Sequence, residues 1–197
     1  GGAFGFRDQL QDAAALAATD PECTRNMIIK CASRQFKKGD VLHWWHEGFA
    51  DGLPRGVRTM ISDDRLFLPL AACEYAEVSG DAAIFDEQIP YLADMKIPCG
   101  QQNIYCEMER SDDTETLYEH CCRAVELSFE LRGAHGLPLM GTGDWNDGMD
   151  AVGWDGGESV VVGWLLLLAA RALLPVCKKR GDTARAMLFE RESAAIR

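Results

Sequence analysis

The most chemically capable side chains gather in one short stretch, Gly136–Asp150, which reads GLPLMGTGDWNDGMD. Asp144, Trp145, Asp147 and Asp150 lie within seven residues of one another, and the flanking glycines allow tight backbone turns. An indole offers an apolar face to a sugar ring, while carboxylates can bond sugar hydroxyls or protonate a glycosidic oxygen. The stretch therefore favours a carbohydrate site. The structural alternative is a capped turn, in which Asp and Asn side chains bond nearby backbone amides.

Two other interpretations of this stretch fail on spacing. A calcium loop of the EF-hand type needs an acid or amide at its fifth position and glycine at its sixth, where this chain has Gly148 and Met149. A dinucleotide-binding fingerprint that starts at Gly141 and Gly143 needs a third glycine, and Asn146 stands in its place. The sequence thus predicts neither a calcium loop nor a dinucleotide site here.

A second group of candidate side chains is the stretch His43–Glu47, which reads HWWHE. Two histidines three residues apart could bind a metal, and His46 opens an HExxH pattern. The second histidine of that pattern is replaced by Ala50, and no Cys or acid follows at a matching spacing, so we predict no metal site. The two tryptophans are either anchors packed inward or platforms for a sugar, and the sequence leaves both open.

Near the start of the chain, Arg7 to Asp12 read RDQLQD. On a helix, Arg7 and Gln11 share one face, and Asp8 and Asp12 share the next. A solvated first turn is the simple explanation. The apolar residues 13–18 that follow instead indicate a buried helix whose polar end faces a pocket.

Basic residues followed by acidic ones occupy Arg55–Asp64. Ser62 followed by two acids is typical of a helix start, which explains Asp63 and Asp64 without a functional role. This stretch alone is weak evidence for a site.

The periodic segments are helical, and none shows the period-2 alternation of a sheet. We therefore predict an all-α chain in which long loops carry the chemistry. The predicted helices cover residues 7–19, 21–39, 62–80, a short segment from 81, 114–132, 158–179 and 182–197, and the loops cover residues 43–58, 90–113 and 133–157.

The chain has 197 residues and a formal net charge of −11. Its length suits one domain. Nucleic acids and anionic membrane surfaces attract clustered Lys and Arg, so the acidic balance argues against both as partners. The longest apolar run, residues 160–170, is interrupted by Arg171 and is too short to span a bilayer. No basic segment leads into an apolar one, so we predict no signal peptide.

None of the eight cysteines forms a C-x-x-C pair. We predict buried thiols in a reducing compartment, and hence a cytoplasmic protein. The chain opens on Gly1 rather than Met and ends without a terminal signal, so we expect it to be part of a longer polypeptide.

Taken together, these stretches resemble the catalytic domain of glycoside hydrolase family 94, the inverting β-glucoside phosphorylases. The resemblance runs from about Gly2 to Trp164 and is closest to the phosphorylase-like part of cyclic β-1,2-glucan synthases and to 1,2-β-oligoglucan phosphorylases. It is carried, in chain order, by GAFGFRDQLQD, HWWHE, GVRTMISDDRLFLPLA, TLYEHCCRAVE, HGLPLMGTGDWNDGMD and GGESVVVGW. It implies that residues 1–197 form the first part of an (α/α)6 barrel whose later helices are missing.

The resemblance also implies roles for individual residues. Asp147 matches the general acid, and Trp145 matches a residue that lines the glucosyl site. Arg7 and Asp12 match a pair that holds sugar hydroxyls. The remaining residues in matching stretches are assigned to substrate binding at the rim: Asp144, Arg58, Asp63, Asp64 and Glu158.

The implied activity is the transfer of a glucosyl unit from a β-glucoside, of the β-1,2-glucan type, to inorganic phosphate, which gives α-glucose 1-phosphate. No cofactor is expected, phosphate is the co-substrate, and its binding residues are expected outside this chain. The expected partners are a β-linked gluco-oligosaccharide and the rest of the same polypeptide.

The sequence departs from the family pattern at two places, and both concern the acceptor side of the site. Val161 stands where a Trp is expected, and the stretch between His46 and Arg55 is longer than usual.

Two other functions stay open. An inverting hydrolase would need a second carboxylate to activate water, for which Asp12 or Asp64 are candidates. A truncated glycan-binding piece would keep the sugar subsite without turnover.

Overall fold

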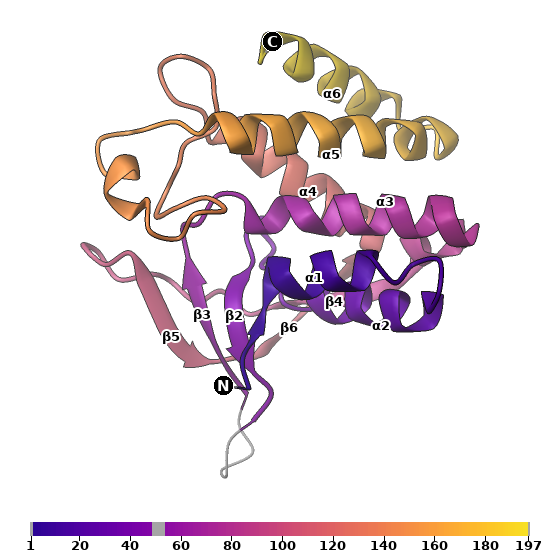
Figure 1. Ribbon diagram of the computed structural model, residues 1–197, viewed down its shortest axis with the longest axis horizontal. Helices are drawn as coiled ribbons and strands as arrows, with labels where there is room; N and C mark the ends of the chain where they lie inside the picture. Colours follow the sequence, from indigo (N-terminus) through magenta and orange to yellow (C-terminus); the bar gives the residue numbers. More distant parts are fainter. Residues whose placement is uncertain (1, 49–53, 197) are drawn as a thin grey trace.

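Helices in this chain stack on one side of the molecule and antiparallel strands extend from the other (Figure 1). The computed structural model describes residues 2–48 and 54–196, so part of the unusually long stretch before Arg55 lies outside the described residues. The helices are α1 (Phe6–Ala14), α2 (Pro21–Ala32), α3 (Phe67–Ser79), α4 (Leu117–Glu130), α5 (Val160–Lys179) and α6 (Thr183–Ala195). Three 3-10 helices, η1 (Asp64–Leu66), η2 (Ala82–Asp86) and η3 (Asp150–Gly153), lie between them.

The starts of α2 and α5 have side-chain caps, whereas the helix predicted from residue 62 has none and begins as η1 and then α3. The Asp20 side chain accepts a hydrogen bond from Cys23 N at 3.1 Å, with Pro21 in the first turn of α2. Ser159 caps α5 in the same way. Gly80 closes α3 with a φ of 76°, a left-handed conformation that favours glycine. Helices α1 and α2 end earlier than predicted, and the short helix predicted from residue 81 is the 3-10 helix η2.

The prediction of an all-α chain, part of an (α/α)6 barrel, is wrong, because the chain contains two antiparallel sheets. One has the strand order β1 (Phe4–Gly5), β2 (Leu42–His46), β3 (Arg55–Thr59) and β5 (Asn103–Glu107). The other pairs β4 (Gln88–Leu92) with β6 (Arg110–Thr116). Five of these strands overlap the predicted loops. They are short, and β6 is polar on both faces, so no apolar alternation reveals them.

The core lies between the stacked helices and the first sheet. Helix α3 packs between α1 and α5, while α2 packs on α1 and α6 packs on α5 (Figure 1). Fully buried side chains at the centre of this core include Leu10, Ile28, Leu68, Val125 and Leu166. Helices α1 and α5 and the 3-10 helix η1 all begin at the same side of the molecule, next to the first sheet.

Helix α5 is longer than the apolar run in the sequence, because Arg171 does not end it. Its 20 residues are long and apolar enough to cross a membrane on length and composition alone, and 39% of its most apolar window is buried inside the protein. Core helices of soluble proteins meet the same criteria, so this is weak evidence.

The eight cysteines are free thiols. Cys31, Cys121, Cys122 and Cys177 are buried as predicted. Cys23 and Cys99 are exposed, so the prediction of buried thiols is wrong for these two.

Candidate active site

One arginine joins the three segments that meet at this side of the molecule. Arg7, in the first turn of α1, is only 7% exposed. Its Nη1 lies 3.1 Å from both carboxylate oxygens of Asp63 and donates to the Asp144 carbonyl oxygen at 3.0 Å. Its Nη2 donates to Asp147 Oδ1 at 2.6 Å. The guanidinium therefore holds the loop around Asp147 against α1 and against the start of η1.

A histidine completes the cluster on the other side of Asp147. His43 Nδ1 is hydrogen-bonded to Asp64 Oδ2 at 2.8 Å, and its Nε2 lies 3.7 Å from Asp147 Oδ2. The pairing of β2 with β3 shifts register between Leu42 and Trp44, so His43 sits at an irregularity of the strand. Such bulges re-aim a side chain. This irregularity explains why His43 reaches the carboxylates although its neighbour Trp44 also lines the pocket.

Burial and mutual repulsion control the protonation of the two adjacent acids. Both Asp63 and Asp64 are at most 2% exposed. Burial, and then the charge of Asp64, raises the pKa of Asp63 to about 7 against the opposing effect of Arg7. Burial also raises the pKa of Asp64, although its hydrogen bond with His43 acts in the opposite direction. Burial would lower the pKa of His43, but that hydrogen bond and the nearby carboxylates raise it above its usual value.

The four acids of the cluster differ in their access to solvent. Asp63, Asp64 and Asp144 are buried, whereas the Asp147 side chain is 52% exposed. Asp147 lines an open pocket of about 420 Å³. The other residues that line this pocket are Ala3, Gly5, Asp8, His43, Trp44 and His46. Asp147 is therefore the acid of the cluster that a ligand in this pocket can reach.

The two tryptophans of the HWWHE stretch have different environments. Trp45 is fully buried and stacks on Phe4 with ring centroids 5.7 Å apart, so it is an anchor of the core. Trp44 is half-buried, lines the pocket, and lies 5.4 Å from the ring of His46. The anchor interpretation is confirmed for Trp45, and the platform interpretation stays a prediction for Trp44.

Hydrogen bonds within the Gly136–Asp150 stretch form the capped turn that the sequence also allowed. Asp144 Oδ2 accepts from Ser159 Oγ at 2.7 Å, and Asp144 Oδ1 accepts from Asn146 N at 2.9 Å. Asn146 Oδ1 in turn accepts from Gly148 N at 3.0 Å. Asp144 and Asn146 thus shape the turn, and Asp147 is left to face the pocket.

A second set of contacts fixes this loop to the segment after β3. Ser62 N and Ser62 Oγ both donate to the Gly143 carbonyl oxygen, at 3.0 and 3.1 Å. Gly141 has a φ of 65°, and a Cβ at this position would collide with the Met60 carbonyl oxygen. Glycine is therefore required where the loop crosses the chain next to β3.

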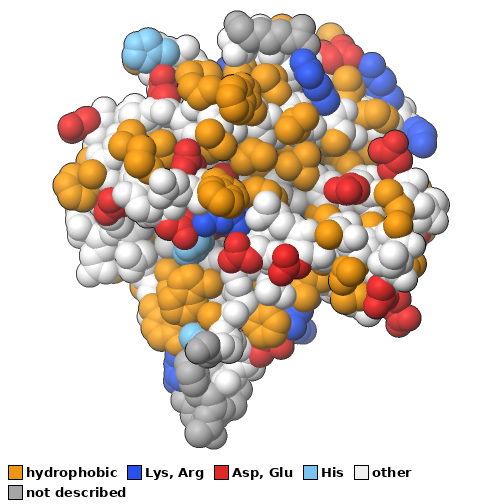
Figure 2. Space-filling model, in the orientation of Figure 1, with side chains coloured by type: hydrophobic (Ala, Val, Ile, Leu, Met, Phe, Trp, Pro, Cys, Tyr) orange, Lys and Arg blue, Asp and Glu red, His pale blue; other side chains and the backbone are white. Residues whose placement is uncertain are grey.

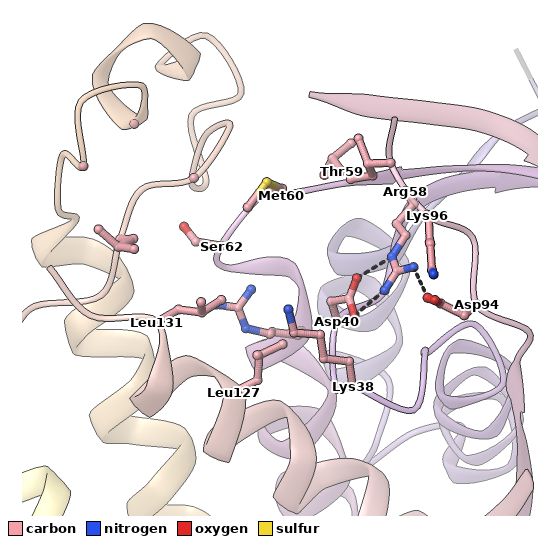
Figure 3. Close-up of a pocket in the computed structure, with 16 residues that line it drawn as sticks. Lys38, Asp40, Arg58, Thr59, Met60, Ser62, Asp94, Lys96, Leu127 and Leu131 are labelled. Atoms are coloured by element: carbon pink, nitrogen blue, oxygen red, sulfur yellow. Dashed lines mark hydrogen bonds and ion pairs between the residues drawn. The ribbon is translucent and has the colours of Figure 1, made fainter. Parts of the chain in front are cut away.

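None of the eight residues assigned to substrate binding lines the pocket. Arg7, Asp63, Asp64 and Asp144 belong to the buried cluster described above, and the other four lie elsewhere. Asp12 is exposed on α1, and Trp145 is 59% exposed beside Asp147 without lining the pocket. Glu158 accepts from His135 N at 2.8 Å. Arg58 belongs to a different cavity, where it bonds Asp40 and Asp94 (Figure 3).

Sequence reasoning missed part of the pocket. His43 and His46 were considered only as metal ligands, whereas Asp8 belongs to the polar helix end that was expected to face a pocket. Within residues 2–48 and 54–196, no group of three or more His, Cys, Asp or Glu side chains is placed to hold a metal ion. The histidine–carboxylate contact joins residues 21 positions apart in the chain, so no local motif indicates it.

Comparison with known proteins defines the class. The chain matches the catalytic domain of the glycosyl hydrolase 94 superfamily over residues 1–197. The chain therefore belongs to this family.

Its curated relatives are carbohydrate-active enzymes much longer than this chain. It is 44% identical over its whole length to the cyclic β-(1,2)-glucan synthase NdvB of Rhizobium meliloti, of which it covers 7%. It is 30% identical over 91% of its length to the 3-O-β-D-glucopyranosyl-β-D-glucuronide phosphorylase of Paenibacillus borealis, covering 21% of that protein. It is 32% identical over 79% of its length to the solabiose phosphorylase of the same organism, covering 17% of it. The family and these relatives support carbohydrate phosphorolysis or glucan synthesis, and the chain spans at most 21% of the length of these three relatives.

Proposed function

We propose that this chain forms part of the active site of an inverting phosphorylase that moves a glucosyl unit from a β-1,2-linked glucan to inorganic phosphate. The reaction class is supported by the family and by its phosphorylase members. The linkage is supported by the 44% identity to a cyclic β-(1,2)-glucan synthase. The product is α-glucose 1-phosphate, and no cofactor takes part.

The observation that carries this proposal is the position of Asp147. It is the acid of the Arg7 cluster that is half exposed and faces the pocket, whereas Asp63, Asp64 and Asp144 are buried. Asp147 donates its proton to the glycosidic oxygen as the leaving sugar departs. Arg7 fixes the orientation of the Asp147 carboxyl through Oδ1, and Oδ2 lies on the side of His43.

The proposed sugar contacts surround this acid. Trp44 lines the pocket and offers a ring face, and Asp8 offers a carboxylate that can bond sugar hydroxyls. Trp145, exposed beside Asp147, walls the transferred glucose from outside the pocket.

Phosphorolysis needs one acid in the protein rather than an acid and a base. Phosphate arrives as an anion and attacks the anomeric carbon from the face opposite the leaving oxygen, so no carboxylate has to activate a water molecule. Of the two bases considered for a hydrolase, Asp64 is buried against His43 and Asp12 is outside the pocket. Neither is placed to activate water in this pocket.

The test uses the full polypeptide that contains these residues. Asp147→Asn keeps the size of the side chain but removes the transferable proton. Turnover of an unactivated β-1,2-glucan should fall by roughly 10²–10⁴-fold, the usual contribution of a placed proton donor. Glucan affinity should barely change, because the interaction belongs to the transition state.

Asp150→Asn is the matched control, because Asp150 lies in the same loop but does not line the pocket. It should leave turnover within a few-fold of the wild type. Undiminished activity in Asp147→Asn would remove the acid assignment. Release of glucose by the wild type without phosphate would instead show a hydrolase.

A further inference from the structure

A second cavity, of about 500 Å³, lies apart from the Asp147 pocket and shares no lining residue with it (Figure 3). One wall is apolar and includes Leu127 and Leu131 of α4 and Leu139. The other walls come from the turn after α2, the end of β3 and the segment after β4, which together carry most of the charged groups. The charged side chains that line it are Lys38, Asp40, Arg58, Arg65, Asp94 and Lys96.

The two carboxylates of this cavity are already neutralised by one arginine. Arg58 donates to Asp40 Oδ2 at 2.6 Å and Oδ1 at 2.9 Å, and to Asp94 Oδ1 at 2.6 Å. Figure 3 shows the Arg58 guanidinium between these two acids. Lys38 and Lys96 line the cavity from the same two segments, and neither forms an ion pair with any residue in the ranges the structure describes. With four cations against two carboxylates, the cavity has a net charge of +2 in a chain whose net charge is −11.

The strongest feature of the cavity is the guanidinium of Arg65. Arg65 follows Asp63 and Asp64 in the chain, lines the cavity, and is only 4% exposed. Its Nε donates to Ser128 Oγ at 2.7 Å. Among residues 2–48 and 54–196, its two terminal nitrogens have no hydrogen-bond partner, and no carboxylate forms an ion pair with it.

An arginine in this state is costly to the protein. Burial removes much of the hydration of this charge, and the nearby carboxylates of Asp40, Asp64 and Asp63 offset that loss only in part, since none of them forms an ion pair with it. The effect is visible in its protonation, since burial lowers the pKa of Arg65 to about 10. It still carries its charge at neutral pH.

We propose that this cavity binds a small molecule bearing an oxyanion, a phosphate ester or a carboxylate, through the terminal nitrogens of Arg65 and the ammonium groups of Lys38 and Lys96. A guanidinium presents parallel donors that match two oxygens of either group. The net charge of +2 suits a dianion. The apolar wall holds the body of the molecule, and the volume lies within the range of small-molecule sites. This site is independent of the phosphorolysis at Asp147.

The test titrates phenyl phosphate and, separately, benzoate into the full polypeptide by calorimetry. Both should show saturable binding to the wild type, and the tighter of the two identifies the oxyanion. Arg65→Met should weaken binding by roughly 10–100-fold, the usual contribution of hydrogen bonds to a charged group. The double variant Lys38→Met, Lys96→Met should weaken it by about tenfold at low ionic strength, with less effect in high salt.

Two controls separate this site from others. Lys178→Met removes the same charge from an exposed position on α5 and should leave binding unchanged. The double lysine variant should keep wild-type phosphorolysis, because neither lysine belongs to the Asp147 pocket. Both lysines are exposed, so this variant should fold even if Arg65→Met does not. Absence of saturable binding to the wild type, or equal affinity in all variants, overturns the proposal.

Discussion

At the scale of single residues, the cluster around Arg7 combines groups whose proton affinities are shifted in the same direction. Asp63, Asp64 and His43 all have raised pKa values, the two acids because they are buried and the histidine because it faces carboxylates. The folded protein therefore holds protons on this cluster at pH values where the unfolded chain has released them.

These raised pKa values make the folded protein less stable as the pH rises. The pKa of Asp63 rises from 3.8 to about 7 on folding, so between these values the folded state binds more protons than the unfolded state. The free energy of unfolding contributed by Asp63 therefore falls as the pH rises through this window. Asp63→Asn should flatten the decline in melting temperature of the full polypeptide between pH 4 and pH 8.

Asp112→Asn, an exposed acid on β6, should leave the decline unchanged. Because Asp64 and His43 contribute with the same sign, part of the decline should remain in Asp63→Asn. Equal slopes in Asp63→Asn and the wild type would show that Asp63 is ionised throughout this range.

At the scale of elements, the sequence predicted what local chemistry determines. The helix start at Asp20 was predictable, since capping depends on a few neighbouring residues. The capped start predicted at Ser62 was not found, because the Ser62 hydroxyl bonds Gly143 instead and α3 begins at Phe67. The Gly136–Asp150 stretch could be proposed as part of the site because its acids and its tryptophan are close together in the sequence. The strands were not predictable, because their pairing joins segments up to about 50 residues apart and their stabilisation comes from partners rather than from their own pattern. The contact of His43 with Asp64 depends on that pairing, so it was missed too.

The loop that carries Asp147 is held by hydrogen bonds between neighbouring elements. Asp144 accepts hydrogen bonds from Ser159, the cap of α5, and from Asn146 within the turn. Asp144→Ala removes both acceptors, so the buried Ser159 hydroxyl, which still accepts from Val162 N, has no acceptor for its own proton. The variant should lose about 1–3 kcal/mol of stability, the cost of an unsatisfied buried group, measured by urea unfolding of the full polypeptide.

Asp155→Ala serves as the control, since Asp155 is exposed in the segment that leads to α5. It should change the free energy of unfolding by less than about 0.5 kcal/mol. A loss in Asp144→Ala no larger than in Asp155→Ala would mean that the loop is held by its other contacts, such as those of Ser62 with Gly143.

At the scale of the whole molecule, exposed apolar side chains gather on one face. Figure 2 shows hydrophobic side chains gathered over the region of α3 and α5. On α5 the exposed side chains include Val160, Val161, Leu168 and Trp164, the last of which is 64% exposed. A continuous apolar surface of this kind is typical of an interface. We propose that further parts of the polypeptide cover it.

Residues 1–197 expressed alone should therefore bind a hydrophobic dye strongly, unfold over a broad temperature range and show no turnover. Trp164→Gln should reduce dye binding by the isolated segment but destabilise the full polypeptide, where the indole would be buried. A sharp unfolding transition and measurable phosphorolysis by residues 1–197 would contradict this prediction.

The strand β2 also limits how this chain can change in length during evolution. Trp45 points into the core and its neighbour Trp44 lines the Asp147 pocket, because successive side chains of a strand face opposite sides. Inserting or deleting one residue between His43 and His46 would exchange the two faces, exposing a core tryptophan and burying a pocket residue at once. Length variants in this part of the family should therefore accumulate outside Leu42–His46, where they leave both tryptophans in place.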